Sequence, residues 1–309
     1  MTIFAMVFPG QGSQTVGMLA ELAANYSVVE ATFVEASGVL GYDLWQLVQQ
    51  GPAEELNKSC QAQPALLASS VAIWRVWQQQ GGRMPALLAG HSLGEYSALV
   101  CAGSLDFTSA IQVVALRGKL MQKLAPAGSG AMSAIIGLNN DTITAACEKA
   151  SQGKVVSLVN FNSPNQAVIA GHKEAVERAG ILCKENGAKC VLQLQVSVPS
   201  HCSLMKPAAE KLALALEAIT FITPRIPVIN NVDVRAEQDP ATIRQALVRQ
   251  LYSPVRWTET MEYLASQGAN VLLEIGPGKV LTGLIKHMAC TLSGVAVNNP
   301  TSLTSAIKY

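Results

Sequence analysis

Short apolar runs alternate with longer amphipathic stretches along the first 125 residues. Residues 3–8 and 85–89 are short apolar runs, the form expected of strands that are buried on both faces of a parallel sheet. A helix is expected to begin near Val16, and helical periodicity covers residues 26–40, 64–80 and 107–124. This alternation predicts an α/β layer built on a parallel sheet.

A loop of small residues at 126–130 separates this region from shorter elements. Four strands and two helices follow in the order β-α-β-β-α-β, at residues 131–138, 141–150, 155–160, 166–170, 173–186 and 189–196. That order is typical of the ferredoxin-like unit. Longer elements resume after Pro199, with helices at 205–216, 241–251 and 257–266 and strands at 228–231 and 271–275. The pattern predicts a discontinuous α/β domain at 1–125 and 199–309, with a small ferredoxin-like domain inserted at 126–198.

The composition is typical of a compact enzyme. Half of the 309 residues are apolar and 14% are charged, which excludes disordered and fibrous classes. A net charge of +1 gives no strong field for nucleic acid or an anionic membrane, so neither is expected as a partner. Seven cysteines without a Cys-x-x-Cys pair argue against a disulfide framework or a zinc site and favour a reducing cytoplasm. We expect neither a signal peptide nor a membrane span, because no apolar run approaches the ~20 residues required.

One motif carries a candidate nucleophile. Residues 90–94 read Gly-His-Ser-Leu-Gly, the Gly-x-Ser-x-Gly elbow, between a predicted buried strand and a predicted helix. Glycines are required because this sharp turn leaves no room for a Cβ beside the serine. Ser92 is then presented at a helix N-terminus, and the backbone N–H of Leu93 points at a developing oxyanion. The alternative is a tight strand-to-helix turn with an incidental serine.

A serine hydroxyl needs a base, and the chain has four histidines. His91 lies inside the elbow, where its side chain is expected to point away from that of Ser92 and to pack the turn. His172 begins a polar helix and is expected to be solvated. His201, at the junction between the two predicted domains, and His287, late on an amphipathic helix, both remain candidates for the base.

Two further positions invite a functional interpretation. The turn at residues 10–14 lacks the third glycine of a dinucleotide loop and the Gly-Lys-Ser/Thr of a P-loop. Gln11 is a candidate for a second oxyanion donor, and the alternative is a helix N-terminus built of small residues. Arg117 lies on an otherwise apolar helical stretch. It either extends to solvent, which is the commoner arrangement, or binds the free carboxylate of a dicarboxylic thioester.

Cys202, next to His201, is expected to be a small buried hydrophobic residue, because nothing strongly electropositive flanks it. No cluster of histidines and carboxylates has the spacing of metal ligands, so no metal is predicted.

Five motifs together resemble the bacterial malonyl-CoA:acyl carrier protein transacylases of type II fatty-acid synthesis. They are residues 8–14 (Phe-Pro-Gly-Gln-Gly-Ser-Gln), residues 90–96 (Gly-His-Ser-Leu-Gly-Glu-Tyr), Arg117-Gly118, residues 198–201 (Val-Pro-Ser-His) and residues 274–278 (Glu-Ile-Gly-Pro-Gly). The resemblance covers the whole chain. It implies a hydrolase-like large domain with a parallel sheet, plus an inserted ferredoxin-like small domain.

The resemblance also implies a role for each matching residue. Ser92 would become malonylated, with His201 as its base, and the main-chain carbonyl of Gln250 would orient the histidine in place of an acid. Arg117 would bind the malonyl carboxylate, and the backbone amides of Gln11 and Leu93 would form the oxyanion hole. The substrates would be malonyl-CoA and the phosphopantetheine thiol of acyl carrier protein. A monomer without a cofactor is expected, with Lys279 and Lys286 as candidates for docking the acidic carrier protein.

Two other functions compete with transfer. A serine hydrolase acting on coenzyme A thioesters would use the same elbow and release the acyl group to water. A noncatalytic acyl-binding module would tolerate replacement of Ser92. The arginine and the lack of a clear acidic triad member favour transfer over hydrolysis.

Overall fold

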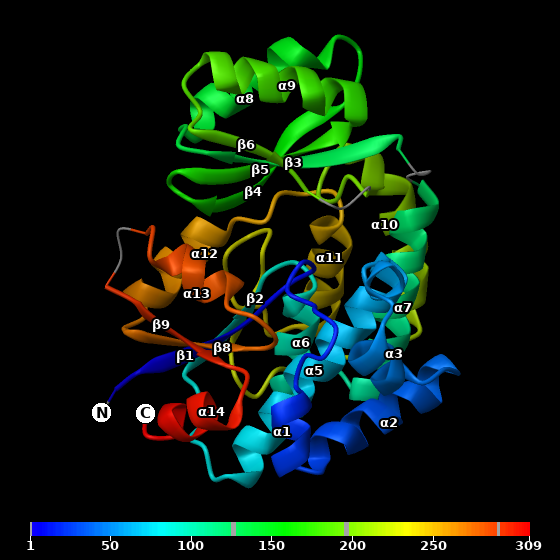
Figure 1. Cartoon of the computed structure of the whole chain (residues 1–309), viewed down its shortest axis with the longest axis vertical. Coiled ribbons are helices and arrows are strands. Elements are labelled where there is room, and N and C mark those ends of the chain that lie inside the picture. Colours follow the sequence, from blue (N-terminus) through cyan, green and yellow to red (C-terminus); the bar gives the residue numbers. More distant parts are fainter. Residues whose placement is uncertain (1, 125–127, 195–197, 289–290) are drawn as a thin grey trace.

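A parallel sheet of five strands forms the centre of the larger part of the molecule. The computed structural model describes residues 2–124, 128–194, 198–288 and 291–309 (Figure 1). The strands are β1 (Phe4–Phe8), β2 (Leu87–Gly90), β7 (Val228–Ile229), β8 (Val271–Ile275) and β9 (Ser293–Val297), and they lie side by side in the order β7-β2-β1-β8-β9. All four pairings are parallel, as the sequence predicts.

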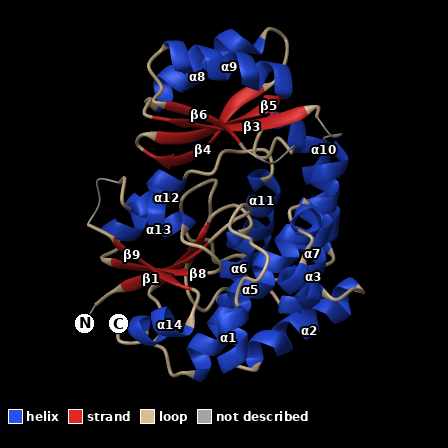
Figure 2. Ribbon diagram, in the orientation of Figure 1, coloured by secondary structure: helices blue, strands red, loops and turns tan. Residues whose placement is uncertain are grey.

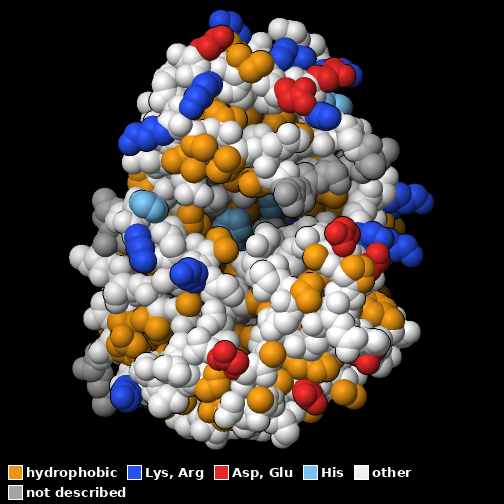
Figure 3. Space-filling view, viewed as in Figure 1, with side chains coloured by type: hydrophobic (Ala, Val, Ile, Leu, Met, Phe, Trp, Pro, Cys, Tyr) orange, Lys and Arg blue, Asp and Glu red, His pale blue; other side chains and the backbone are white. Residues whose placement is uncertain are grey.

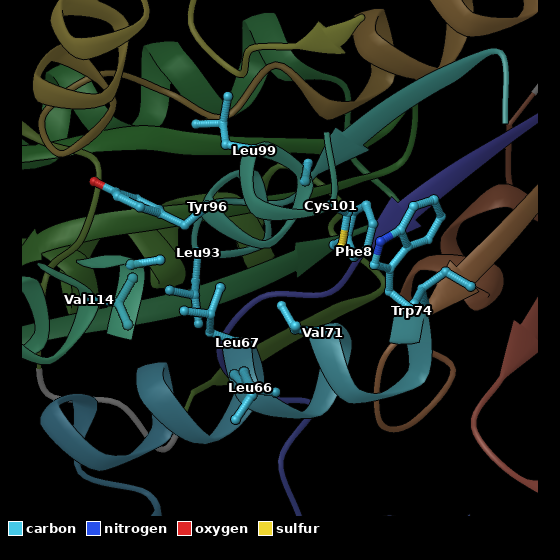
Figure 4. Close-up of a cluster of buried hydrophobic side chains, with 14 of the residues drawn as sticks. Phe8, Leu66, Leu67, Val71, Trp74, Leu93, Tyr96, Leu99, Cys101 and Val114 are labelled. Atoms are coloured by element: carbon cyan, nitrogen blue, oxygen red, sulfur yellow. The ribbon is translucent and has the colours of Figure 1, made fainter. Parts of the chain in front are cut away.

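Both faces of this sheet are buried. In β1, Phe4, Met6 and Phe8 point into one hydrophobic cluster, and the alternate residues Ala5 and Val7 point into another. Figure 4 shows part of the first cluster, in which Phe8 lies with Val71, Trp74 and Cys101. The unbroken apolar runs of the sequence are therefore explained by helices on both sides of the sheet.

Helices pack on the two faces in unequal numbers (Figures 1 and 2). One face carries α12 (Trp257–Ser266) and α13 (Val280–Ile285), whose apolar side chains share a hydrophobic cluster with Ala5 and Val7. The larger cluster on the other side includes α1 (Ala20–Asn25), α2 (Val28–Leu40), α3 (Leu44–Gln50), α4 (Ala53–Leu56), α5 (Ser59–Gln79), α6 (Gly94–Cys101), α7 (Phe107–Leu124), α10 (Lys206–Glu217), α11 (Pro240–Gln250) and α14 (Pro300–Ala306).

A second, antiparallel sheet stands apart from the first. It contains β3 (Gly130–Ile136), β4 (Val156–Ser163), β5 (Gln166–His172) and β6 (Cys190–Gln193) in the order β4-β5-β3-β6, with α8 (Asn140–Ser151) and α9 (Lys173–Glu185) on one face. Figure 2 shows these helices on the side turned away from the larger sheet. The chain order and the strand order are those of the predicted ferredoxin-like unit.

The opposite face of the small sheet looks toward the rest of the molecule. Met132, Val159 and Leu194 belong to a hydrophobic cluster on that face, and Cys202 from the larger part joins them. Backbone hydrogen bonds from Phe161 N to Val255 O (3.0 Å) and from Val255 N to Val159 O (2.8 Å) tie β4 to the segment before α12. The small unit is thus fixed over the larger one.

Several predicted boundaries differ from the structure. The first helix begins at Ala20, because the chain turns at Gly17 and Leu19, which have φ values of 84° and 64°. Helix α5 begins at Ser59, whereas the predicted helix begins at Pro64. The helix continues through the proline because burial of its apolar side chains outweighs the one backbone hydrogen bond that proline cannot donate. Helices α3 and α4, of seven and four residues, are too short to show a clear periodicity. Residues 126–127 of the predicted boundary loop and 195–196 of the predicted last strand lie outside the described residues.

Candidate active site

The elbow between β2 and α6 holds Ser92 in a left-handed conformation, with φ at 52°. A Cβ on Gly90 would lie 1.8 Å from the carbonyl carbon of Gly94, and one on Gly94 would lie 2.0 Å from the carbonyl oxygen of Phe8. Both glycines are therefore required for the strand and the helix to approach this closely. The strand–turn–helix context predicted for the motif is present, and it exposes the serine at the N-terminus of α6.

Ser92 and His201 form a hydrogen bond of 2.8 Å between Oγ and Nε2. The other ring nitrogen of His201 donates to the main-chain carbonyl of Gln250 at 2.7 Å. The backbone N–H of His201 also donates to Leu251 O at 2.9 Å, so both the ring and the main chain of the histidine are attached to the end of α11. The structure therefore places His201, and not His287, beside the serine.

The bond to Gln250 determines the tautomer of His201. A carbonyl oxygen only accepts hydrogen bonds, so Nδ1 carries the ring proton and Nε2 is free to accept the hydroxyl proton of Ser92. Burial, followed by the positive charge of Arg117, lowers the pKa of His201 to about 3. The imidazole is neutral at physiological pH, the form that a general base requires.

The carbonyl of Gln250 also occupies a favourable place for this role. It lies in the last residue of α11, where helix carbonyls have no partner within the helix and carry partial negative charge. A proton transferred to His201 would be stabilised by this end of the helix. With this geometry, His201 could act as a base without an acidic residue in direct contact with the imidazole.

Arg117 is buried, with 1% of its surface exposed, so the solvated arrangement favoured by composition is wrong. Its Nη1 donates to Gln63 Oε1 at 2.9 Å, and its Nη2 donates to Gln250 Oε1 at 3.0 Å and to Ser92 Oγ at 3.2 Å. Within the described residues its Nε–H has no acceptor, and no carboxylate lies within ion-pair distance of the guanidinium. Burial lowers the pKa of Arg117 because the charge is poorly solvated. A buried cation of this kind would be stabilised by an anionic ligand.

Two backbone donors lie beside the serine. In the described part of the chain, neither Leu93 N–H nor Gln11 N–H donates to a protein acceptor, and both residues line the same cleft as Ser92. The loop carrying Gln11 packs directly against the elbow, because a Cβ on Gly10 would lie 2.6 Å from His91 O. The side chain of Gln11 donates to Ser59 Oγ at 3.1 Å, which fixes the loop to the start of α5. The arrangement suits an oxyanion hole.

These groups line a cleft of about 420 Å³ between the small sheet and the larger part of the molecule. Met132 and Leu194 contribute apolar surface from the small sheet, and Ser92, Arg117 and His201 lie on the other side. The space-filling view shows this hollow, with histidine side chains visible inside it (Figure 3). The volume is in the range of small-molecule sites.

The other histidines have separate environments. His91 forms a 2.9 Å hydrogen bond with Asn162 and an edge-on contact with Trp257, so it packs the turn as predicted, although it also lines the cleft. His172 is half-buried and accepts a hydrogen bond from Val155 N. His287 is exposed and lies in a turn after α13, which corrects the prediction of a helical position.

Cys202, next to the histidine, and the metal-ligating residue types elsewhere in the molecule complete the inventory of reactive groups. Cys202 is buried, as predicted, and burial raises the pKa of its thiol to about 11, which disfavours the reactive thiolate. Among the described residues, no three histidine, cysteine, aspartate or glutamate side chains are grouped so as to hold a metal. No helix in the described ranges is both long and apolar enough to cross a membrane.

Sequence reasoning missed three buried polar residues that support the site: Gln63, Glu95 and Asn231. Asn231 accepts from Ser92 N and donates to Gly90 O, both at 2.7 Å, and so clamps the elbow. Asn231 follows the carboxyl end of the parallel strand β7, which is where ligand sites lie in such sheets. This position in the sequence could have marked Asn231 as a site residue.

Comparisons with known proteins agree over the full chain. The acyl transferase domain family model matches residues 5–298. A malonyl CoA-acyl carrier protein transacylase of Salmonella typhimurium is 66% identical over 307 residues, which cover 99% of each chain. One of Bacillus subtilis is 44% identical and covers 100% of this chain and 97% of its own length.

Solved structures give the same picture. An acyl carrier protein S-malonyltransferase of Vibrio cholerae has a TM-score of 0.96 at 66% identity, covering 98% of this chain and 99% of its own. A malonyl-transacylase in complex with a type II PKS acyl-carrier protein has a TM-score of 0.98 at 66% identity and covers 99% of both chains.

Proposed function

The chain belongs to the acyl transferase family, and within it to the malonyl CoA-acyl carrier protein transacylases, and from this premise we propose that it transfers malonyl through an ester on Ser92. The donor is malonyl-CoA and the acceptor is the phosphopantetheine thiol of acyl carrier protein. The two half-reactions use the same site in turn, which makes the mechanism ping-pong.

One observation carries this proposal: a buried arginine, which has no carboxylate partner among the described residues, donates to a serine that is hydrogen-bonded to a neutral histidine. The Arg117 Nη2 to Ser92 Oγ distance is 3.2 Å, and the Ser92 Oγ to His201 Nε2 distance is 2.8 Å. An acyl group that carries a free carboxylate satisfies both groups at once, because its carboxylate pairs with the guanidinium while its thioester carbon meets the serine.

In the first half-reaction, His201 Nε2 takes the proton of Ser92 as Oγ attacks the thioester carbon. The resulting oxyanion lies between the N–H groups of Leu93 and Gln11. Collapse of the tetrahedral intermediate breaks the carbon–sulfur bond and leaves malonyl-Ser92. The thiolate of coenzyme A leaves with the proton held by His201.

In the second half-reaction, His201 takes the proton of the carrier protein's thiol, and the sulfur attacks the ester. The proton returns to Ser92 as the carbon–oxygen bond breaks.

The malonyl-transacylase of similar structure was solved with an acyl-carrier protein, which supports a carrier protein as the partner here. Lys279 and Lys286 are exposed at the start and the end of α13 and remain predictions for docking. We further propose a monomer in the cytoplasm, an environment that suits the six described cysteines, all of which are free thiols.

The test is intact-protein mass after brief incubation with malonyl-CoA or with acetyl-CoA. Wild type should gain a malonyl adduct and little acetyl adduct, and addition of phosphopantetheinylated carrier protein should remove the adduct and produce malonyl carrier protein. Ser92→Ala should gain nothing. Ser97→Ala is the matched control, because Ser97 is a buried serine on α6, the helix that follows the elbow, and its hydroxyl has no described partner. Rapid release of free malonate instead of transfer would identify a hydrolase, and absence of any adduct or turnover would refute the proposal.

A further inference from the structure

Glu95 is a buried carboxylate that the mechanism above does not use. It is the second residue of α6, three positions after Ser92, with 2% of its surface exposed. Its Oε2 accepts hydrogen bonds from Gln250 Nε2 at 2.8 Å and from Asn231 N at 3.0 Å. No lysine or arginine in the described ranges forms an ion pair with it. Burial of a carboxylate is costly, so its presence behind the nucleophile requires an explanation.

The two donors to Glu95 are the residues that hold the reacting groups. Asn231 clamps the backbone on both sides of the elbow. Gln250 orients His201 through its main-chain carbonyl, and its side-chain amide donates to Ser92 O at 3.0 Å and accepts from Arg117 at 3.0 Å. One carboxylate oxygen therefore contacts both supports of the site.

The chemistry of Glu95 determines the direction of the Gln250 amide. A carboxylate only accepts, so the amide NH₂ must face Glu95, and a guanidinium only donates, so the amide oxygen must face Arg117. The amide is held between an anion and a cation in one orientation.

We propose, on the basis of the function proposed above, that Glu95 is a positioning residue of malonyl transfer, which acts as a carboxylate by fixing Gln250 and Asn231 and by stabilising the His201 imidazolium through Gln250. Its role corresponds to that of the acid in a catalytic triad, but it acts on the histidine through Gln250 and not by direct contact. Glu95 does not line the cleft, and in the described structure its carboxylate bonds neither Ser92 Oγ nor the His201 ring.

Ionisation of Glu95 makes the proposal measurable. Burial raises the pKa of Glu95 to about 7, against the lowering effects of its hydrogen bonds and of the positive charge of Arg117. Asp233, after β7, raises it slightly, and Glu237 lines the same small void behind the helix. His201, with its pKa lowered to about 3, is already neutral in this range. Loss of activity just below neutral pH is therefore expected from Glu95, and a Glu95→Gln variant separates this ionisation from that of His201.

The experiment measures kcat/KM for acylation of Ser92 by malonyl-CoA between about pH 5 and pH 9, which reports the ionisations of the free enzyme. Wild type should lose activity toward acid with a midpoint near 7. Glu95→Gln keeps the acceptor oxygen and removes the charge, so it should be reduced roughly tenfold or more at high pH and show no acid limb near neutrality. Glu237→Gln is the matched control, because its carboxylate lines the same void without bonding Gln250 or Asn231, and it should keep the wild-type profile.

Several outcomes would overturn the proposal. A Glu95→Gln enzyme with the wild-type limb and rate would assign the limb to another group. A flat wild-type profile would also contradict the proposal, because the acid limb expected from Glu95 would be absent. This measurement needs no variant, so it remains decisive if the Glu95→Gln protein does not fold. A limb whose midpoint moves strongly with temperature would indicate an imidazole, because carboxyl ionisation changes little with temperature. Failure of wild type to form any malonyl adduct would refute malonyl transfer itself. A normal adduct on wild type, with a Glu95→Gln enzyme that keeps the wild-type pH profile, would refute only the role of Glu95.

Discussion

Replacement of Arg117 should change which acyl group reacts with Ser92. The guanidinium is buried, donates to Gln63, Gln250 and the nucleophile, and has no carboxylate partner in the described chain. Arg117→Ala removes the cation, and Arg117→Lys keeps a positive charge without the planar fork. The prediction concerns the ratio of malonyl to acetyl acylation rather than either rate alone.

The expected magnitude follows from the burial of the site. Loss of one partner from a buried ion pair costs about 3–5 kcal/mol, which corresponds to roughly 10²–10⁴-fold in rate. Arg117→Ala also leaves Gln63 Oε1 and Gln250 Oε1 without a donor, a loss of about 1–3 kcal/mol for each that applies to both acyl groups. The ratio removes this common term, so the malonyl preference should fall by the full factor.

The assay is single-turnover acylation of Ser92, with kcat/KM measured separately for malonyl-CoA and acetyl-CoA. Arg117→Lys should fall between wild type and Arg117→Ala, because a point charge attracts the carboxylate without bidentate geometry. Arg75→Ala is the control, since this arginine pairs with Glu35 away from the cleft and should leave the ratio unchanged. Equal losses for both acyl groups in Arg117→Ala would refute the assignment of Arg117 as the carboxylate-binding residue.

Three further predictions test the supporting structure. Gly94→Ala should destabilise the fold by about 3 kcal/mol or more in chemical denaturation, because its Cβ would lie 2.0 Å from Phe8 O. Gly38→Ala is the control: Gly38 lies within α2 with open space around it, so this change should stabilise the fold by roughly 0.5–1 kcal/mol. Gln11→Ala should slow single-turnover acylation less than about tenfold, because the proposed donor is the backbone N–H; a loss of about 10²–10³-fold would assign the role to the side chain. Because burial raises the pKa of Glu95 to about 7, the folded protein favours its protonated form, and wild type loses this stabilisation as pH rises from 4.5 to about 7. Glu95→Gln should therefore gain up to roughly 3 kcal/mol in unfolding free energy relative to wild type over that window. A difference in unfolding free energy that stays constant across pH would contradict this.

The sequence predicted the elements whose pattern is local. The helix at 107–124, the helix at 257–266 and the strand at 271–275 have the predicted bounds, because each combines a clear period with a clear stop signal. The elbow was predictable for the same reason, since its glycines are required by contacts within a few residues of Ser92 and with the neighbouring strand.

Long-range features of the site were not predictable from local patterns. The surroundings of Arg117 depend on α5 and α11, which bring Gln63 and Gln250 to it from positions 54 and 133 residues away in the chain. An isolated helix gives no sign of such partners, and composition favours an exposed arginine. The choice of His201 over His287 likewise followed from family resemblance, because the residues alone left both open.

The arrangement of charge suggests how binding and chemistry are coupled. The positive charge of Arg117 is, after burial, the largest cause of the lowered pKa of His201. A malonyl carboxylate that pairs with Arg117 neutralises this charge and so raises the basicity of the histidine at the moment when it must take the proton from Ser92. An acetyl group leaves the guanidinium unpaired and the base weak. Selection for malonyl should therefore appear in the rate of the chemical step as well as in binding, and removal of Arg117 should reduce acetyl transfer less than malonyl transfer because it relieves the same repulsion.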